Sequence, residues 1–166
     1  MVGTGKTIPD KDTSEIGFEA RKWLSRDSNN LLLLIDDLEA ARRPIKQSVF
    51  DRYRSAIDEL LRSQSDRERA SVHFLVNMIE AYYFADTAAV NAVLNTRLSD
   101  HPDDVEEIYH PKNDLKKCRP GFDEVRHGEK IIEKLDLEHV LDNPKTCGSL
   151  RVLFAWCLVP AVDGDC

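Results

Sequence analysis

Three acidic residues directly follow the most hydrophobic run of the sequence. The segment Leu31–Ile35 has five apolar residues in a row, and Asp36, Asp37 and Glu39 come immediately after it. Carboxylates this close in sequence repel one another unless a cation or a basic side chain neutralises them. Mg²⁺ or Mn²⁺ would suit such a site, because hard divalent ions prefer carboxylate and water oxygens. The alternative is a polar loop in which one aspartate caps the next helix.

Glu80 is the fourth acid that we assign to this site. It lies four residues beyond a second predicted strand, 70–76, within the largely apolar stretch 76–84. A charge among apolar neighbours is costly to bury without a partner. If the two strands are parallel, their carboxyl ends open onto one edge of the sheet, where ligands bind in open α/β folds. An exposed helical glutamate is the alternative for Glu80. We predict one metal-binding cluster of four acids: Asp36, Asp37, Glu39 and Glu80.

Basic side chains lie close to these acids in the sequence and further along it. Arg42 and Arg43 could contact phosphate oxygens beside a metal ion, or could pair with the acids that precede them. His110 with Lys112 and Lys116 offers an ionisable imidazole and two phosphate-binding lysines. We assign Lys112 a catalytic and phosphate-binding role and Lys116 a phosphate-binding role. A solvated loop that enters a helix is the alternative for this second segment.

The elements that must position these residues alternate between helix and strand. Helical spacing of apolar residues predicts helices over 14–26, where Trp23 joins the apolar stripe, and over 46–62. The run Leu31–Ile35 predicts a strand buried on both faces, followed by the strand 70–76. Strand, helix and strand in this order form a right-handed unit with parallel strands. Further helices are expected at 77–86, 88–94, 129–135 and 150–158. The fold class is therefore α/β, a small parallel sheet flanked by helices, with a helical C-terminal half.

Length and charge limit the classes of protein to which the chain can belong. Its 166 residues fit a single domain over 1–166. No run approaches the ~18 apolar residues of a membrane span, and 1–7 lacks the apolar stretch of a signal peptide, so we expect a cytoplasmic protein. Thirty acidic against 23 basic residues give a net charge of −7. This charge argues against broad coating of nucleic acid, although a metal ion and a few basic residues can still support nucleic-acid chemistry.

Four segments together carry a resemblance to a known family. The most specific is the pattern E-A-[WY]-x-[FL]-A-D, which the chain has at 80–86. The four segments, whose order and spacing carry the match, are 31–39, 73–86, 110–116 and 147–157. In these segments the chain resembles the TOPRIM-like bacterial domain-of-unknown-function family 4276.

The resemblance implies a compact α/β domain in which acidic residues hold Mg²⁺ or Mn²⁺ for phosphodiester chemistry. By position, Asp36, Asp37 and Glu39 match the acidic pair of TOPRIM domains in a D-x-E variant. Glu80 and Asp86 match the second acidic motif of the family. Members are often encoded beside an ATPase in bacterial anti-phage defence loci, so the resemblance also implies an ATPase partner.

One element of TOPRIM domains has no counterpart in this sequence. The early strand with E-G-x-T-E is not found before Gly5. Either the first strand is missing, or Glu80 takes the place of its glutamate, or the domain is not catalytic. A sheet edge left open in this way could be covered by a second copy of the chain.

These observations lead to two functional hypotheses. The first is a divalent-metal-dependent nuclease that acts in anti-phage defence, with nucleic acid and an ATPase as partners and no membrane association. The second is a non-catalytic TOPRIM-like subunit that binds or regulates the ATPase, which the negative charge and the unmatched early strand favour.

Overall fold

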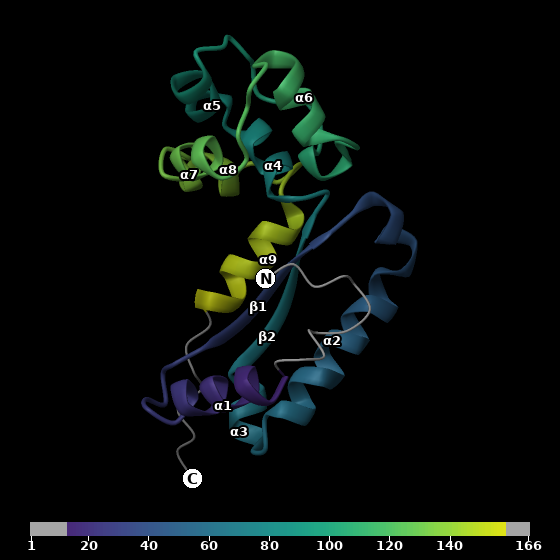
Figure 1. Cartoon of the computed structure of the whole chain (residues 1–166), viewed down its shortest axis with the longest axis vertical. Helices are drawn as coiled ribbons and strands as arrows, with labels where there is room; N and C mark the ends of the chain where they lie inside the picture. Colours follow the sequence, from purple (N-terminus) through teal and green to yellow (C-terminus); the bar gives the residue numbers. More distant parts are fainter. Residues whose placement is uncertain (1–12, 159–166) are drawn as a thin grey trace. The chain divides into compact units, whose positions relative to one another are not determined.

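The computed structural model describes residues 13–158 (Figure 1). In this part of the chain, two parallel strands form one small sheet flanked by helices, and the chain after the second strand is mainly helical, as predicted. The strands are β1 (Leu32–Leu38) and β2 (Ala70–Val76). The α-helices are α1 (Thr13–Leu24), α2 (Lys46–Leu60), α3 (Gln64–Glu68), α4 (Ile79–Tyr82), α5 (Thr87–Leu94), α6 (Pro111–Cys118), α7 (Arg126–Ile132), α8 (Leu137–Asp142) and α9 (Gly148–Leu158). The 3₁₀ helices are η1 (Ala40–Ile45), η2 (Tyr83–Ala85) and η3 (Val105–Glu107). None of these helices is long and apolar enough to cross a membrane.

The described chain forms two compact units, and both strands contribute to each of them. Unit 1 contains residues 13–36, 42–73 and 155–158, and unit 2 contains 37–41 and 74–154. Each strand therefore begins in unit 1 and ends in unit 2. Of the four predicted site acids, Asp36 belongs to unit 1, whereas the other three belong to unit 2.

Helices α1 and α2 pack against each other in unit 1. Ala20 and Leu24 of α1 are buried, as are Val49, Tyr53 and Ile57 of α2. These positions recur every three or four residues, so each helix presents one apolar face to the core, as its sequence predicts.

A glycine allows the close approach of these two helices. A Cβ atom at Gly17 would lie 2.8 Å from Cδ2 of Leu60, closer than side chains normally pack. At the same crossing, Nη1 of Arg21 donates a hydrogen bond of 2.6 Å to the carbonyl of Leu60, near the end of α2. The prediction that Trp23 lies on the buried stripe is wrong: its ring is half exposed, and its indole N–H reaches the carbonyl of Leu31.

Strand β1 extends further than predicted. It continues through Asp36 and Asp37 to Leu38, so the prediction that the strand stops before the two aspartates is wrong. The physical reason is backbone pairing, because the amide of Asn77 donates a 3.0 Å hydrogen bond to the carbonyl of Leu38. Consecutive residues of a strand point to opposite faces, so the extension turns the two aspartates away from each other.

Strand β1 is also more exposed than predicted, whereas β2 is largely buried. The side chain of Ile35 is 45% exposed, so the prediction that β1 is buried on both faces is wrong. A strand becomes dry on both faces only where other elements cover both of them, and the Ile35 side remains open to solvent. In β2, Val72, His73 and Phe74 are buried in succession, which shows that both of its faces are covered there.

The chain leaves β2 through a turn rather than directly into the predicted helix 77–86. Asn77 and Met78 both have positive φ angles, 58° and 78°. Helix α4 therefore begins only at Ile79, after which the chain continues as η2. The helix α3 and the helix α8 were not predicted, since each is too short to show a helical period.

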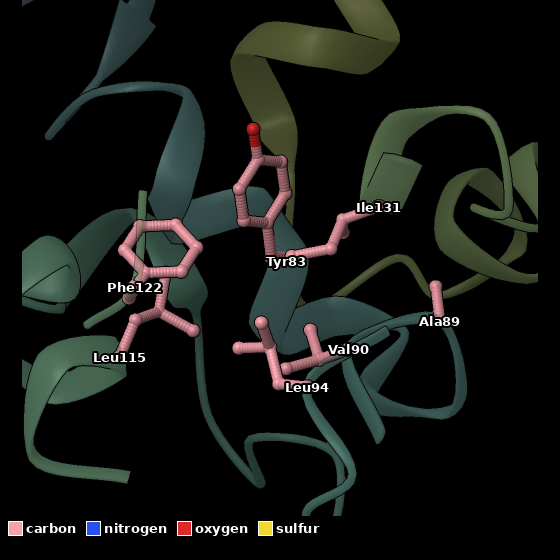
Figure 2. Packing of buried hydrophobic residues seen from close by; sticks show 7 residues of the cluster. All are labelled: Tyr83, Ala89, Val90, Leu94, Leu115, Phe122 and Ile131. Atoms are coloured by element: carbon pink, nitrogen blue, oxygen red, sulfur yellow. The ribbon is translucent and has the colours of Figure 1, made fainter. Parts of the chain in front are cut away.

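Unit 2 has two clusters of buried apolar side chains. One is centred on Tyr83 and includes Leu115 of α6, Ile131 of α7, and Val90 and Leu94 of α5 (Figure 2). The other contains Ala81, Tyr82, Ala85, Val105, Val140 and Cys147. Helix α4 and η2 lie between the two clusters and supply side chains to both, which holds the acid-bearing turn after β2 in a packed environment.

Candidate functional site

Asp36 has a hydrogen-bond partner within unit 1. Its carboxylate accepts a 2.6 Å hydrogen bond from the hydroxyl of Tyr53 on α2. Burial, together with this hydrogen bond and the negative charge of Asp36, raises the pKa of Tyr53 to about 12. This hydrogen bond connects α2 to β1.

Glu80 is buried in unit 2 without a comparable partner. Its side chain is only 5% exposed, in the first turn of α4. Within the described residues, no donor or cation forms a hydrogen bond or an ion pair with its carboxylate. A carboxylate in this setting loses part of its hydration and gains no hydrogen bond in return. The prediction that this acid is buried among apolar neighbours is therefore confirmed, and its lack of a partner needs an explanation.

The hydroxyl of Tyr83 is influenced by the charges of both Glu80 and Asp37. Burial raises the pKa of the Tyr83 hydroxyl, and the negative charges of Glu80 and Asp37 raise it further. Both carboxylates therefore lie near this hydroxyl, which points away from Val90 and Leu94 (Figure 2). A Cβ atom at Gly128 would lie 3.0 Å from the hydroxyl oxygen, so the backbone of α7 also approaches it. The sequence predicts that Asp37 and Glu80 share one site, and in the structure the charges of both act on the same tyrosine.

The turn between β2 and α4 is strained and incompletely hydrogen-bonded. Met78 has φ 78° and ψ 157°, a region in which residues other than glycine are rare and cost about 1–3 kcal/mol. Asn77 is 2% exposed, and its Nδ2 donates a 2.6 Å hydrogen bond to the carbonyl of Glu106. Its Oδ1 is buried and has no hydrogen-bond partner. Strain and an unsatisfied acceptor in the same turn are typical of sites under functional constraint.

Glu39 lies at a cavity beside this turn. The cavity has a volume of about 280 Å³, and its lining includes Glu39, Asn77, Met78, Tyr109 and His110. The carboxylate of Glu39 is exposed, so solvent can reach it. Sequence reasoning assigned Glu39 and noted His110, but it missed Asn77 and Tyr109. The signal for Asn77 was its position directly after a strand, since asparagine tolerates a left-handed backbone better than most residues.

The predicted phosphate-binding residues have identifiable neighbours. Arg42 and Arg43 lie on η1, and the positive charge of Arg42 acts on the hydroxyl of Tyr53, the partner of Asp36. Lys112 and Lys116 on α6 both form ion pairs with Glu124, the second at 3.2 Å. These two lysines lower the pKa of Glu124, chiefly through the hydrogen bond from Lys112.

A second cavity in unit 2 was not predicted. Its volume is about 570 Å³, and its lining includes Asp86, Asp100, Lys134, Asp136 and His139. Asp86, the last residue of the family motif, is buried and accepts a 2.8 Å hydrogen bond from the amide of Asp136. Nε2 of His139 lies 2.9 Å from Asp100, whose carboxylate also receives hydrogen bonds from Thr87. These acids all have structural partners, which favours a role in holding helices and loops together.

The predicted metal site requires acidic side chains that are grouped closely enough to bind one ion. In the part of the chain that the structure describes, no three side chains of His, Cys, Asp or Glu are grouped as a metal ion would require. Asp36 accepts from Tyr53, whereas Asp37 and Glu80 lie near Tyr83 and Glu39 lies at the cavity. Mg²⁺ needs only one or two protein carboxylates, because waters and substrate phosphates complete its shell. Asp37 and Glu80 fit this smaller requirement in kind and charge, and the four-acid cluster stays a prediction.

Comparison with known proteins identifies a family and nothing closer. A family model described as "Domain of unknown function (DUF4276)" matches residues 4–152. No curated protein and no solved structure matches the chain.

Proposed function

The chain belongs to the DUF4276 family, and from this premise we propose that it is a TOPRIM-like, divalent-metal-dependent nuclease. The largely buried side chain of Glu80, which forms no hydrogen bond or ion pair within the described residues, is the observation that carries the proposal. An enzyme that needs negative charge for a cation must keep that charge free of other partners, and folding alone gives no reason to bury it.

In this proposal Asp37 and Glu80 would hold the metal ion, and Glu39 would add negative charge to the site. When bound, Mg²⁺ or Mn²⁺ polarises a phosphate oxygen and lowers the pKa of a bound water. The Tyr83 hydroxyl stays protonated at neutral pH, because burial and the two carboxylates raise its pKa. It therefore remains a potential hydrogen-bond donor beside these two charges.

The remaining predicted residues have supporting roles in this proposal. Arg42 and Arg43 bind the phosphates of the nucleic-acid substrate. Lys112 and Lys116 contribute a positive surface only if the substrate displaces Glu124 from its ion pairs. Asp36 acts through its hydrogen bond with Tyr53, which connects Asp36 of β1 to α2 within unit 1.

Thermal unfolding with and without metal tests the proposal before a substrate is known. Millimolar Mn²⁺ should raise the midpoint of the parent protein by several degrees, because ligand binding to the folded state stabilises it by mass action. Asp37→Asn and Glu80→Gln should abolish this rise. Glu129→Gln, which changes an exposed glutamate on α7 in the same way, should retain it.

A nuclease assay with Mn²⁺ on single-stranded DNA and RNA then measures activity directly. Asp37→Asn and Glu80→Gln should reduce cleavage at least about a hundredfold, and Glu129→Gln should cleave like the parent. A parent midpoint that does not respond to millimolar Mn²⁺ or Mg²⁺, together with absent cleavage, contradicts the proposal.

A second candidate function is a non-catalytic subunit of an anti-phage defence system that binds a neighbouring ATPase. The ion pairs of Lys112 and Lys116 with Glu124 favour it, because they occupy the positive charges that a nucleic-acid substrate would need. Cleavage assays with and without the product of the neighbouring gene separate the two functions. Binding of the ATPase with no cleavage in either assay would favour the subunit.

A further inference from the structure

The cavity beside the turn at Asn77 has a chemical character of its own. Its volume of about 280 Å³ is close to the lower end of small-ligand pockets, which begin near ~300 Å³. A single planar ring system is the kind of group that a cavity of this size accommodates. All of its lining residues belong to unit 2, so it is a feature of one compact unit.

Two acceptors in the lining of the cavity, on Asn77 and Glu39, favour a ligand that donates hydrogen bonds to them. Oδ1 of Asn77 is a buried acceptor without a partner, and the Nδ2 of the same side chain is already bonded to the carbonyl of Glu106. The carboxylate of Glu39 is a second acceptor and cannot donate while ionised. The lining contains neither lysine nor arginine, so a phosphate group has no cation there.

Aromatic rings form one part of the lining. The rings of Tyr109 and His110 meet edge to face, with centroids 4.3 Å apart. Tyr109 is 66% exposed, which is unusual for a ring of this size. Exposed aromatic side chains of this kind provide stacking surfaces for the bases of unpaired nucleic acid.

We propose that this cavity binds a nucleobase that carries an exocyclic amino group, stacked on Tyr109 with its amino group directed at Asn77 and Glu39. The inference rests on the proposed function, since it identifies how a nuclease of this kind would engage an unpaired base. Cytosine and uracil provide the sharpest comparison, because cytosine presents an amino donor where uracil presents a carbonyl acceptor. A carbonyl directed at Oδ1 of Asn77 would place two acceptors against each other.

Fluorescence anisotropy with labelled ten-nucleotide strands of deoxycytidine and deoxyuridine tests the inference. The measurement uses the full chain with EDTA present, so that binding is read without cleavage. The parent should bind the cytosine strand at least about fivefold more tightly than the uracil strand, the equivalent of one hydrogen bond. Unlabelled cytidine monophosphate and uridine monophosphate, added as competitors, show whether a free nucleotide or a single strand is the preferred source of the base.

Exposed positions allow variants whose folding is easily verified by melting curves. Tyr109→Ala should weaken binding of both strands about tenfold through lost stacking, whereas Tyr109→Phe should bind like the parent. Glu39→Ala should reduce the preference for cytosine. Val125→Ala, at an exposed position outside the cavity lining, should change neither.

Two results would overturn the inference: equal affinity of the parent for both strands, or unchanged affinity after Tyr109→Ala. Because binding is measured without metal, a failed cytosine preference leaves the metal-dependent melting and cleavage results intact. A protein that prefers cytosine but shows no response to Mn²⁺ would retain the base pocket and lose the nuclease proposal.

Discussion

Two regions of unit 2 each contain a largely buried glutamate, and they differ in the hydrogen-bond donors that surround its carboxylate. Glu106 in η3 is 9% exposed, and its carboxylate accepts hydrogen bonds from the hydroxyl of Tyr82 and from both the amide and hydroxyl of Ser149. Glu80 in α4 is 5% exposed and has no such donors among the described residues. The first region gives its carboxylate three hydrogen-bond donors, whereas the second gives its carboxylate none among the described residues.

The difference shows how a structural acid can be distinguished from a functional one. A buried carboxylate with a full set of donors holds distant segments together, as Glu106 connects η3 with the start of α9. A buried carboxylate without donors weakens the fold, so its presence points to a ligand that compensates it. Removing each acid should therefore change stability in opposite directions.

Replacement of Glu106 should produce the largest effect on stability. Glu106→Ala leaves the buried hydroxyl of Tyr82 and the amide of Ser149 without their acceptor, and should cost about 3 kcal/mol of unfolding free energy. Urea denaturation measures the change. Glu106→Gln, which keeps one acceptor oxygen, should lose less, and Glu129→Ala at an exposed site should lose little. A Glu106→Ala protein as stable as the parent would remove the contrast between the two glutamates.

Replacement of Glu80 should have a smaller effect of the opposite sign. In EDTA, Glu80→Gln removes the charge of a largely buried side chain that has no hydrogen-bond donor among the described residues, so the free energy of unfolding should stay the same or rise by about 1 kcal/mol. The same urea titration gives the result. A loss above about 1 kcal/mol would mean that the carboxylate has a structural partner.

The Asp36–Tyr53 pair extends the comparison to unit 1. Tyr53→Phe should cost about 1 kcal/mol, the typical net value of one hydrogen bond. The pKa of Tyr53 is raised from 10 to about 12 in the folded protein. The unfolded chain therefore ionises first, and the stability that the hydroxyl contributes is complete below pH 10 and is lost as the pH rises through 12. Denaturation midpoints of the parent and Tyr53→Phe should converge over this interval, and a constant difference would contradict the assignment.

The pair of His139 and Asp100 should give the smallest effect. The hydrogen bond to Asp100 raises the pKa of His139, so its contribution is complete below pH 6.5 and is lost as the pH rises through the higher folded value. Both side chains are about half exposed, so the contribution should be only a few tenths of a kcal/mol and should decrease in 1 M salt. His139→Gln should remove this pH dependence between pH 5 and 9. An unchanged pH profile would show that the pair adds nothing.

Parts of the candidate site could be predicted because local sequence specifies them. The bounds of β2 agree with the strand predicted at 70–76, since β-branched and aromatic residues lie between clear boundaries. The burial of Glu80 follows from its apolar neighbours. Asn77, Tyr83 and Tyr109 could not be assigned, because their roles depend on segments distant in sequence, such as η3 for Asn77 and α7 for Tyr83.

The sequence by itself determined the α/β class, the parallel order of two strands and the helical second half, because periodicity and the handedness of crossovers are local properties. Only the tertiary structure decided which acidic side chains have a hydrogen-bond partner. The amide of Asn77 extends β1 past both aspartates, and Asp36 then meets Tyr53 while Asp37 lies near Tyr83. Adjacent residues of a strand face opposite ways, and only the packing on each face determines whether a carboxylate finds a donor.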